Sequence, residues 1–185
     1  SCITPSLTDS TLPQTGTSGR IDNSMLEPVP HPGLREISYK RHFTRSTQDF
    51  EDSVRMMLFT DAYLQLNAET QAENGDDAQT IYRKNSKAWV HDKTCFDFEI
   101  NSTTAEAGKA KNWTLSLQTL KDKKNHDLVL NVSKQFLSSK NNHWFQFNGE
   151  LCSTDKVDPH LGLEVTMIPK FRDNKTIVLT WEAPN

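Results

Sequence analysis

The sequence is poor in the features that identify most enzymes, membrane proteins and nucleic-acid-binding proteins. It contains no run of eighteen apolar residues, so we expect no helix that spans a membrane. Its net charge of −3 offers no basic excess for nucleic acid. It also lacks a Gly-x-Ser-x-Gly elbow, a phosphate-binding loop, a His-Glu-x-x-His motif and a Gly-x-Gly-x-x-Gly motif. We therefore predict no enzymatic activity, cofactor or metal, although an active site assembled from distant residues would leave no such motif.

Cysteine is scarce and its count is odd: Cys2, Cys95 and Cys152. Cys95 begins one candidate strand and Cys152 ends another, which favours a Cys95–Cys152 disulfide. Alternatively, Cys2 ties the N-terminal segment to the domain and leaves another thiol free. Three free thiols in a cytosolic protein remain the third interpretation. The chain begins at Ser1 without an initiator methionine, which we interpret as the mature terminus left by signal cleavage.

What the sequence does contain is a set of Asn-x-Ser/Thr glycosylation sites, three of them in segments that alternate apolar and polar residues. Successive side chains of a strand point to opposite faces. Leu128, Leu130 and Val132 therefore leave Asn131 on the outer face, where a bulky glycan must lie. The pattern predicts a secreted, extracellular glycoprotein built mainly of strands. The four sites are Asn101, Asn112, Asn131 and Asn174.

The composition divides the chain in two. Residues 1–45 carry five of the eight prolines and are dense in Ser and Thr, so we expect an extended arm that joins neither helix nor ladder. Residues 46–185 are expected to form a single β-rich domain. This domain should begin with one short helix at 46–60, capped by Ser46 or Thr47. Its apolar stripe would comprise Phe50, Val54, Met57 and Leu58.

From Asp61 onward the apolar period becomes two, starting with Ala62, Leu64, Leu66 and Ala68. Regular short strands joined by polar loops are typical of an antiparallel barrel of about eight strands, or alternatively of a β-sandwich. After this first strand, we expect strands near 79–83, 87–91, 94–101, 112–119, 127–133, 143–148, 162–168 and 175–181.

One face of these strands is strongly apolar and either fills a core or lines a pocket. An eight-stranded barrel is wide enough to hold one small ligand. The candidate ligand-binding residues are Phe96, Phe98, Trp113, Leu115, Phe145, Phe147 and Trp181. Asp97 and Glu99 fall on the opposite, outward parity, where we expect a solvated face. If that parity is reversed, they would line a cavity for a cationic ligand.

The layout resembles secreted lipocalins, specifically the divergent salivary lipocalins of ticks. The resemblance covers residues 46–181. It is carried by a short helix leading into a strand at Asp61–Ala68, by the cysteine of Thr94-Cys-Phe-Asp-Phe98, by about eight strands, and by several glycosylation sites. The chain departs from the family in its long N-terminal arm and in having no room for a C-terminal helix. The resemblance implies sequestration of a small host mediator, sterol or lipid, or immune modulation, in saliva.

Together these features predict a secreted, non-catalytic binding glycoprotein that sequesters a small hydrophobic or amine ligand. The alternative is a secreted β-sandwich that binds an extracellular protein through its outer face or its N-terminal arm.

Overall fold

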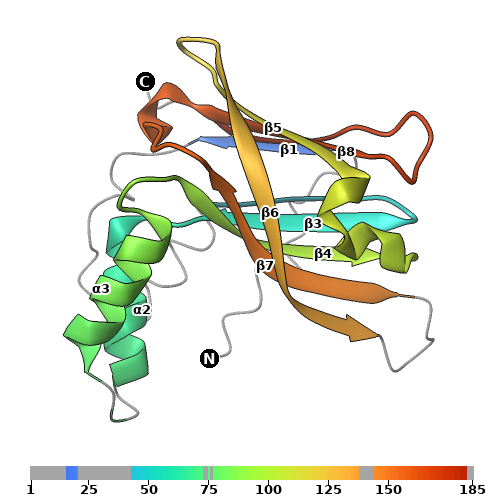
Figure 1. The fold of residues 1–185 in the computed structure, drawn as a ribbon. Helices are drawn as coiled ribbons and strands as arrows, with labels where there is room; N and C mark the ends of the chain where they lie inside the picture. The colour runs from blue at the N-terminus through green and yellow to red at the C-terminus, as the bar shows by residue number, and fades with distance from the viewer. Residues whose placement is uncertain (1–15, 21–42, 73–74, 76, 138–143, 183–185) are drawn as a thin grey trace.

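The computed structural model describes residues 16–20, 43–72, 75, 77–137 and 144–182. In this part of the chain, nine strands form one nearly closed, barrel-like sheet, and two α-helices lie together at one end of it (Figure 1). The prediction of a mainly β, antiparallel barrel is confirmed at this level. The strands are β1 (Gly16–Arg20), β2 (Thr44–Gln48), β3 (Asp52–Leu58), β4 (Cys95–Ser102), β5 (Trp113–Thr119), β6 (Lys124–Leu137), β7 (Phe145–Ser153), β8 (Leu163–Pro169) and β9 (Ile177–Glu182).

The strands follow the order β1-β9-β8-β5-β6-β7-β4-β3-β2. The long strand β6 pairs with β5 through residues 124–127 and with β7 through residues 128–137, so it crosses from one layer to the other (Figure 1). Along the chain β4 is followed by β5, yet β4 is hydrogen-bonded to β7. The order therefore differs from the up-and-down arrangement of lipocalin barrels.

The sheet nearly closes where β9 approaches β2. The indole Nε1–H of Trp181 donates a hydrogen bond of 2.8 Å to the carbonyl of Phe43, just before β2. Strand β1 pairs in parallel with β9 and lies close to β2. Gly16–Arg20 thus corrects the expectation that the arm joins no ladder; this segment carries none of the arm's prolines. The rest of the predicted arm up to residue 42 lies outside the described residues.

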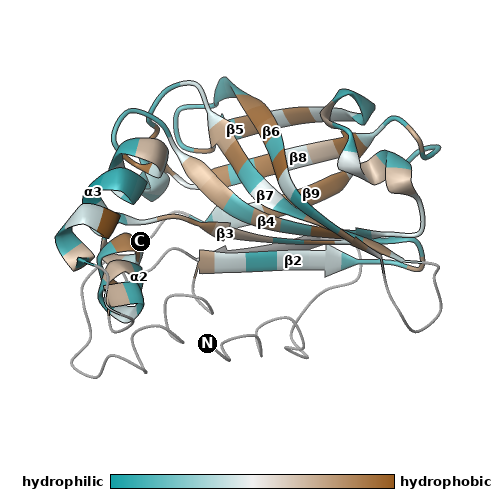
Figure 2. Ribbon diagram, turned by 60° about the horizontal axis from the view of Figure 1, so that its bottom comes forward, coloured by the Kyte–Doolittle hydropathy of each residue, from teal (hydrophilic) through white to brown (hydrophobic). Residues whose placement is uncertain are grey.

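The core lies between the two layers and is built from the inward parity of the strands, as predicted. Apolar and polar residues alternate along the strands (Figure 2). Val54, Met56 and Leu58 of β3 are buried, as are the inward residues of β4, β8 and β9. The remaining buried positions include Trp113, Leu117, Leu130, Phe147 and Leu151.

The predicted helix at 46–60 is wrong: this segment is the hairpin of β2 and β3. Asp49 ends the first strand, because its carboxylate accepts backbone N–H groups from Glu51 and Asp52, both at 2.9 Å, and so forms a turn. The apparent helical stripe arose by chance. Phe50, an exposed residue of the turn, happens to stand at helical spacing from buried residues of β3.

The strands expected at 61–68, 79–83 and 87–91 are also wrong, because these residues form helices α2 (Asp61–Ala72) and α3 (Ala78–Trp89). Thr60 caps α2 by accepting the N–H of Tyr63 at 3.0 Å, and Asp77 caps α3. The residues of α2 are mostly strong helix formers (Ala, Leu, Gln and Glu), and this propensity outweighs the accidental alternation.

None of the described helices is long and apolar enough to cross a bilayer. Two elements of the lipocalin-like layout therefore differ in the structure. The expected helix at 46–60 is the β2–β3 hairpin, and the expected first strand at Asp61–Ala68 is part of helix α2.

The Cys95–Cys152 disulfide is confirmed. The two residues lie directly opposite each other on β4 and β7, with 4.1 Å between their Cα atoms. Cys2 lies outside the described residues.

Gly149 of β7 is a position where any side chain should be costly. A Cβ atom there would lie 1.9 Å from the carbonyl oxygen of Asn131 and 2.9 Å from the ring of Phe98. The carbonyl belongs to β6, close to its register shift between Val132 and Lys134, so it cannot retreat without disturbing the pairing of β6 and β7. We expect Gly149→Ala to lower the free energy of unfolding by about 2–4 kcal/mol in urea denaturation.

Gly75→Ala is the matched control. No atom lies within 4 Å of a Cβ at Gly75, so its cost is limited to the roughly 1–2 kcal/mol imposed by its φ of +98°. Equal losses in the two variants would contradict the steric argument.

Candidate functional site

The tip of the β2–β3 hairpin combines an exposed aromatic side chain with a tightly fixed backbone. Phe50 is 98% exposed, the highest value among the large hydrophobic residues that the structure describes. It sits inside the Asp49 turn, which is closed further by a backbone hydrogen bond of 2.9 Å from Asp49 to Asp52. The aromatic ring is therefore displayed on a defined turn.

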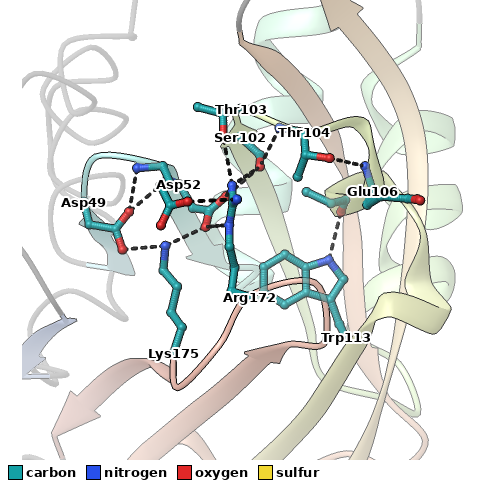
Figure 3. Close-up of polar contacts among 11 residues, drawn as sticks. Asp49, Asp52, Ser102, Thr103, Thr104, Glu106, Trp113, Arg172 and Lys175 are labelled. Atoms are coloured by element: carbon teal, nitrogen blue, oxygen red, sulfur yellow. Dashed lines mark hydrogen bonds and ion pairs between the residues drawn. The ribbon is translucent and has the colours of Figure 1, made fainter.

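Asp52, the first residue of β3, anchors this hairpin to the β8–β9 loop (Figure 3). Its side chain is fully buried and forms a bidentate ion pair with Arg172. The Nε and NH2 groups of Arg172 donate to the two carboxylate oxygens at 3.0 and 3.1 Å. Lys175 Nζ lies 2.5 Å from both Asp52 and Asp49. Ser102 of β4 donates its hydroxyl to Asp52 at 2.6 Å. Three segments far apart in the sequence therefore meet at one buried carboxylate.

Arg172 extends the cluster in two directions. Its NH1 group pairs with Glu51 at 2.9 Å, and NH2 donates to Thr103 Oγ1 at 2.8 Å. Its guanidinium also lies 5.3 Å from the centre of the Phe171 ring, which in turn makes an edge contact with Trp113. The β8–β9 loop is thus packed on the core and charge-paired to the hairpin.

The electrostatics of the cluster favour its charged form. Burial raises the pKa of Asp52, but hydrogen bonds from Arg172, Lys175 and Ser102 outweigh it and hold that pKa below its ordinary value. The pKa of Asp49 is also lowered, since the bonds from Lys175 and two backbone N–H groups outweigh burial. The hydrogen bond to Asp52 raises the pKa of Arg172 despite burial. The charged forms of Asp49, Asp52 and Arg172 are therefore favoured, and these groups hold the tip as ions.

This arrangement is suited to holding the tip of the β2–β3 hairpin in place rather than to acid–base chemistry. Asp52 is covered by three donors, and its lowered pKa makes it a weak base. A pocket of about 180 Å³ beside the cluster is lined by Gln48, Asp49, Asp52, Lys175 and neighbouring residues, and is small and polar. The groups that face outward at this end include the Phe50 ring and the carboxylates of Asp49 and Glu51.

The structure brings the seven predicted ligand-binding residues together on the inward face, where they belong to the packed core. Phe96, Phe98, Trp113, Phe147 and Trp181 are buried, whereas Leu115 and Phe145 are half-buried against the same core. The indole N–H groups of Trp113 and Trp181 are both satisfied by backbone carbonyls, at 2.8 Å. None of the seven lines the pocket of about 180 Å³ beside the cluster or either of the two hollows described next. These side chains serve one another as packing partners.

Two further hollows lie outside the core. A pocket of about 240 Å³ lies at the opposite end of β3 from Phe50, with an apolar lining from Leu58, Phe59, Val90, Val157 and Pro159. An open groove of about 600 Å³ runs between the end of α3 and the outer face of β6 and β7. Lys93 lines both and lies between them.

The four predicted glycosylation sites differ in accessibility. Asn131 and Asn174 are exposed. Asn101 and Asn112 are half-buried, and their amide groups donate to Glu99 at 3.1 Å and to the backbone of Glu106 at 2.9 Å. The outward parity expected for Asn131 is confirmed.

Asp97 and Glu99 lie on the outward parity of β4, as expected, but this face is less solvated than predicted. Asp97 is half-buried and Glu99 is 8% exposed. Arg55 lies directly opposite Glu99 on β3. No described pocket is lined by either carboxylate, so their position gives no support to a cavity for a cationic ligand.

Sequence reasoning missed Phe50, Asp52, Arg172 and Lys175. The usable signal was Asp49, a turn-forming residue between Thr44–Gln48 and the alternating Val54, Met56 and Leu58. Nothing local marks Arg172 and Lys175 as partners of a residue about 120 positions earlier.

No protein-family model matches this chain, and neither a curated protein nor a solved structure gives a significant match.

Proposed function

We propose that this protein is a secreted, non-catalytic binding glycoprotein that recognises an extracellular protein through the tip of the β2–β3 hairpin. The observation that carries the proposal is Phe50, a fully exposed aromatic ring on a turn fixed by buried ion pairs. The Cys95–Cys152 disulfide supports an oxidising compartment, and the exposed Asn131 and Asn174 support glycosylation.

Single exposed apolar residues are common on protein surfaces and need no explanation by themselves. Phe50 differs because its turn is held by a cluster of five charged residues centred on the buried carboxylate of Asp52. An aromatic residue presented on a rigid element loses little conformational entropy on binding, so more of its burial energy appears as affinity. Aromatic anchors of this kind dominate the energetics of many protein interfaces.

The surroundings of Phe50 define the partner's chemistry. Glu51 is about half exposed and Asp49 about one third, whereas Arg172 and Lys175 are largely covered and paired with these acids. The tip therefore presents an apolar centre with an acidic rim. It fits a protein that offers an apolar pocket bordered by Lys or Arg side chains, since complementary charge favours association.

The expected result for Phe50→Ala is a loss of at least about tenfold in affinity, because truncating a central aromatic anchor commonly costs more than 1.4 kcal/mol. The melting temperature should not change, because the ring touches almost nothing in the free protein. The measurement is biolayer interferometry of wild type and variant against a panel of purified extracellular proteins.

Phe136→Ala is the matched control, since Phe136 is also an exposed phenylalanine, on β6. It should leave the same affinities unchanged. Partners whose affinity is insensitive to Phe50→Ala, or equally sensitive to both changes, would show that the tip is not the recognition site.

The pocket at the other end of β3 favours a second candidate function, sequestration of a small hydrophobic or amine ligand, as the lipocalin resemblance implies. Its apolar floor is accompanied by Asp61, Asp158, Lys93 and Lys156, which could pair with a polar group of either charge. Native mass spectrometry of protein from a secretory host, followed by denaturing extraction, tests this candidate. A co-purifying molecule that is displaced by Val90→Trp, a change that fills the pocket, would support it.

A further inference from the structure

The groove between α3 and the sheet contains one of the glycosylation sites in its own wall. One side is formed by Trp89 and Lys93, at the end of α3 and just beyond it. The other side is formed by Val129, Asn131, Glu150 and Cys152. In the β6–β7 ladder Val129 is paired with Cys152 and Asn131 with Glu150, so these four form a compact square on the outer face.

The lining is half apolar and half polar in a way that suits a sugar. Val129 is 59% exposed and leaves an apolar surface bare beside Asn131. Trp89 stacks on Phe59, with 4.7 Å between ring centres, which fixes the indole in the wall of the groove. Lys93 and Glu150 supply charged hydrogen-bonding groups. Sugars combine apolar C–H faces with hydroxyl groups, and flat aromatic or aliphatic side chains bordered by polar ones complement both.

We propose that this groove is the seat of an N-linked glycan carried by Asn131, with the first sugars packed against Trp89 and Val129. The inference rests on the proposed secretion. In the secretory pathway the amide nitrogen of Asn131 would attack the anomeric carbon of a lipid-linked diphosphate oligosaccharide. The nitrogen loses one proton, the C–N bond forms, and the lipid diphosphate leaves.

Size and position single out this site. The groove, of about 600 Å³, lies within the range of roughly 300–1,000 Å³ that holds drug-sized ligands, and a disaccharide is of that size. Asn174 borders a pocket of only about 180 Å³, and the amides of Asn101 and Asn112 already bond to the protein. A seated glycan would cover Val129 and shield the Cys152 side of the disulfide.

The test uses the full chain fused to a cleavable signal peptide and secreted from mammalian cells. Glycopeptide mass spectrometry should find Asn131 occupied. Asn131→Gln should lower the melting temperature of this glycosylated protein by about 2–4 °C, the shift expected for one modest set of contacts in a domain of this size. Hydrogen exchange of residues 88–93 should become faster in the same variant.

Two controls separate the glycan from the side chain. Thr176→Ala, which removes the glycosylation signal of Asn174, the other exposed site, should shift the melting temperature by less than about 1 °C. Asn174 itself is left unchanged because its φ of 54° is left-handed, a conformation that asparagine tolerates better than glutamine. In protein made without glycans in a bacterial periplasm, Asn131→Gln should have no effect. The proposal is overturned by an Asn131 that stays bare while other sites are occupied, or by no occupied site at all. It is equally overturned if Asn131 is glycosylated but Asn131→Gln changes neither the melting temperature nor the hydrogen exchange of residues 88–93. Because the signal peptide is supplied, these outcomes do not depend on whether the Phe50 tip binds a protein.

Discussion

Replacing Cys95 and Cys152 together by alanine is expected to lower the free energy of unfolding by about 4 kcal/mol. The two residues are separated by 57 positions, so the disulfide closes a large loop in the unfolded chain. In the chain-entropy description, closing a loop of this length stabilises the folded state by about 4 kcal/mol. The loop contains β4, β5, β6 and most of β7, so loss of the disulfide should affect a large part of the barrel. Urea denaturation of wild type and double variant measures the effect.

Reduction provides the control for this prediction. A thiol reductant should destabilise the wild-type protein by a similar amount and leave the double-alanine variant unaffected. A difference below about 1 kcal/mol between wild type and variant, or an equal response of both to the reductant, would contradict the role assigned to the disulfide.

The second half of the fold could be predicted because its strands carry a strong local signal. Between Cys95 and Trp181, most inward residues of the strands are apolar and most outward residues are polar, because each strand has one face on the core. The exposed Val129, Phe136 and Ile168 are exceptions. A period of two over six or more residues leaves few alternative interpretations. The same alternating pattern allowed the disulfide to be predicted, because the pattern placed Cys95 and Cys152 at the ends of two strands.

The first half was misread because its signals are short and ambiguous. The hairpin at Thr44–Leu58 has two strands separated by only three residues, and Phe50 in the turn completes a false helical stripe. Helix α2 buries Leu64, Leu66 and Ala68, a spacing that imitates a strand. The capping residues Thr60 and Asp77 were the better evidence, because each satisfies orphan N–H groups that only a helix start leaves.

The candidate site was beyond local reasoning for a different reason. Its charged residues come from 49–52 and from 172–175, and the end of β4 adds the hydroxyl of Ser102. Only the closure of the barrel brings these segments together. Sequence pattern could predict that Asp and Lys lie in loops, but not that these loops meet or that Asp52 is buried. The exposure of Phe50 acquires meaning only once that anchoring is known.

Asp52→Asn is expected to cost about 3–5 kcal/mol of folding free energy, the range found when one partner of a buried ion pair is removed. The side chain of Asp52 is fully buried, and those of Arg172 and Lys175 are about 15% exposed. Asparagine keeps the shape but offers only one acceptor oxygen, and its NH₂ group would face cationic donors. Two largely covered positive charges would then lose their main counter-ion. Thermal and urea unfolding of the purified variant measure the cost.

Glu51→Gln is the matched control because Glu51 pairs with the same Arg172 from an exposed position. An exposed ion pair contributes about 0–1 kcal/mol, so the variant should be close to wild type. Comparable losses in the two variants would show that burial of Asp52 is not the source of the effect. A loss below about 1 kcal/mol for Asp52→Asn would show that the cluster does not stabilise the fold.

The pH dependence of Asp52→Asn gives an independent test of the same cluster. Because the pKa of Asp52 is lowered in the folded state, its contribution is fully present above its unfolded value of about 4. It is lost as the pH falls through the lower, folded pKa, where the carboxylate takes up a proton. The stabilities of wild type and Asp52→Asn should therefore differ by a constant amount near neutral pH and converge below pH 4.

If the tip is anchored as the structure shows, binding through Phe50 should weaken in Asp52→Asn as well, because the ring would lose its fixed turn.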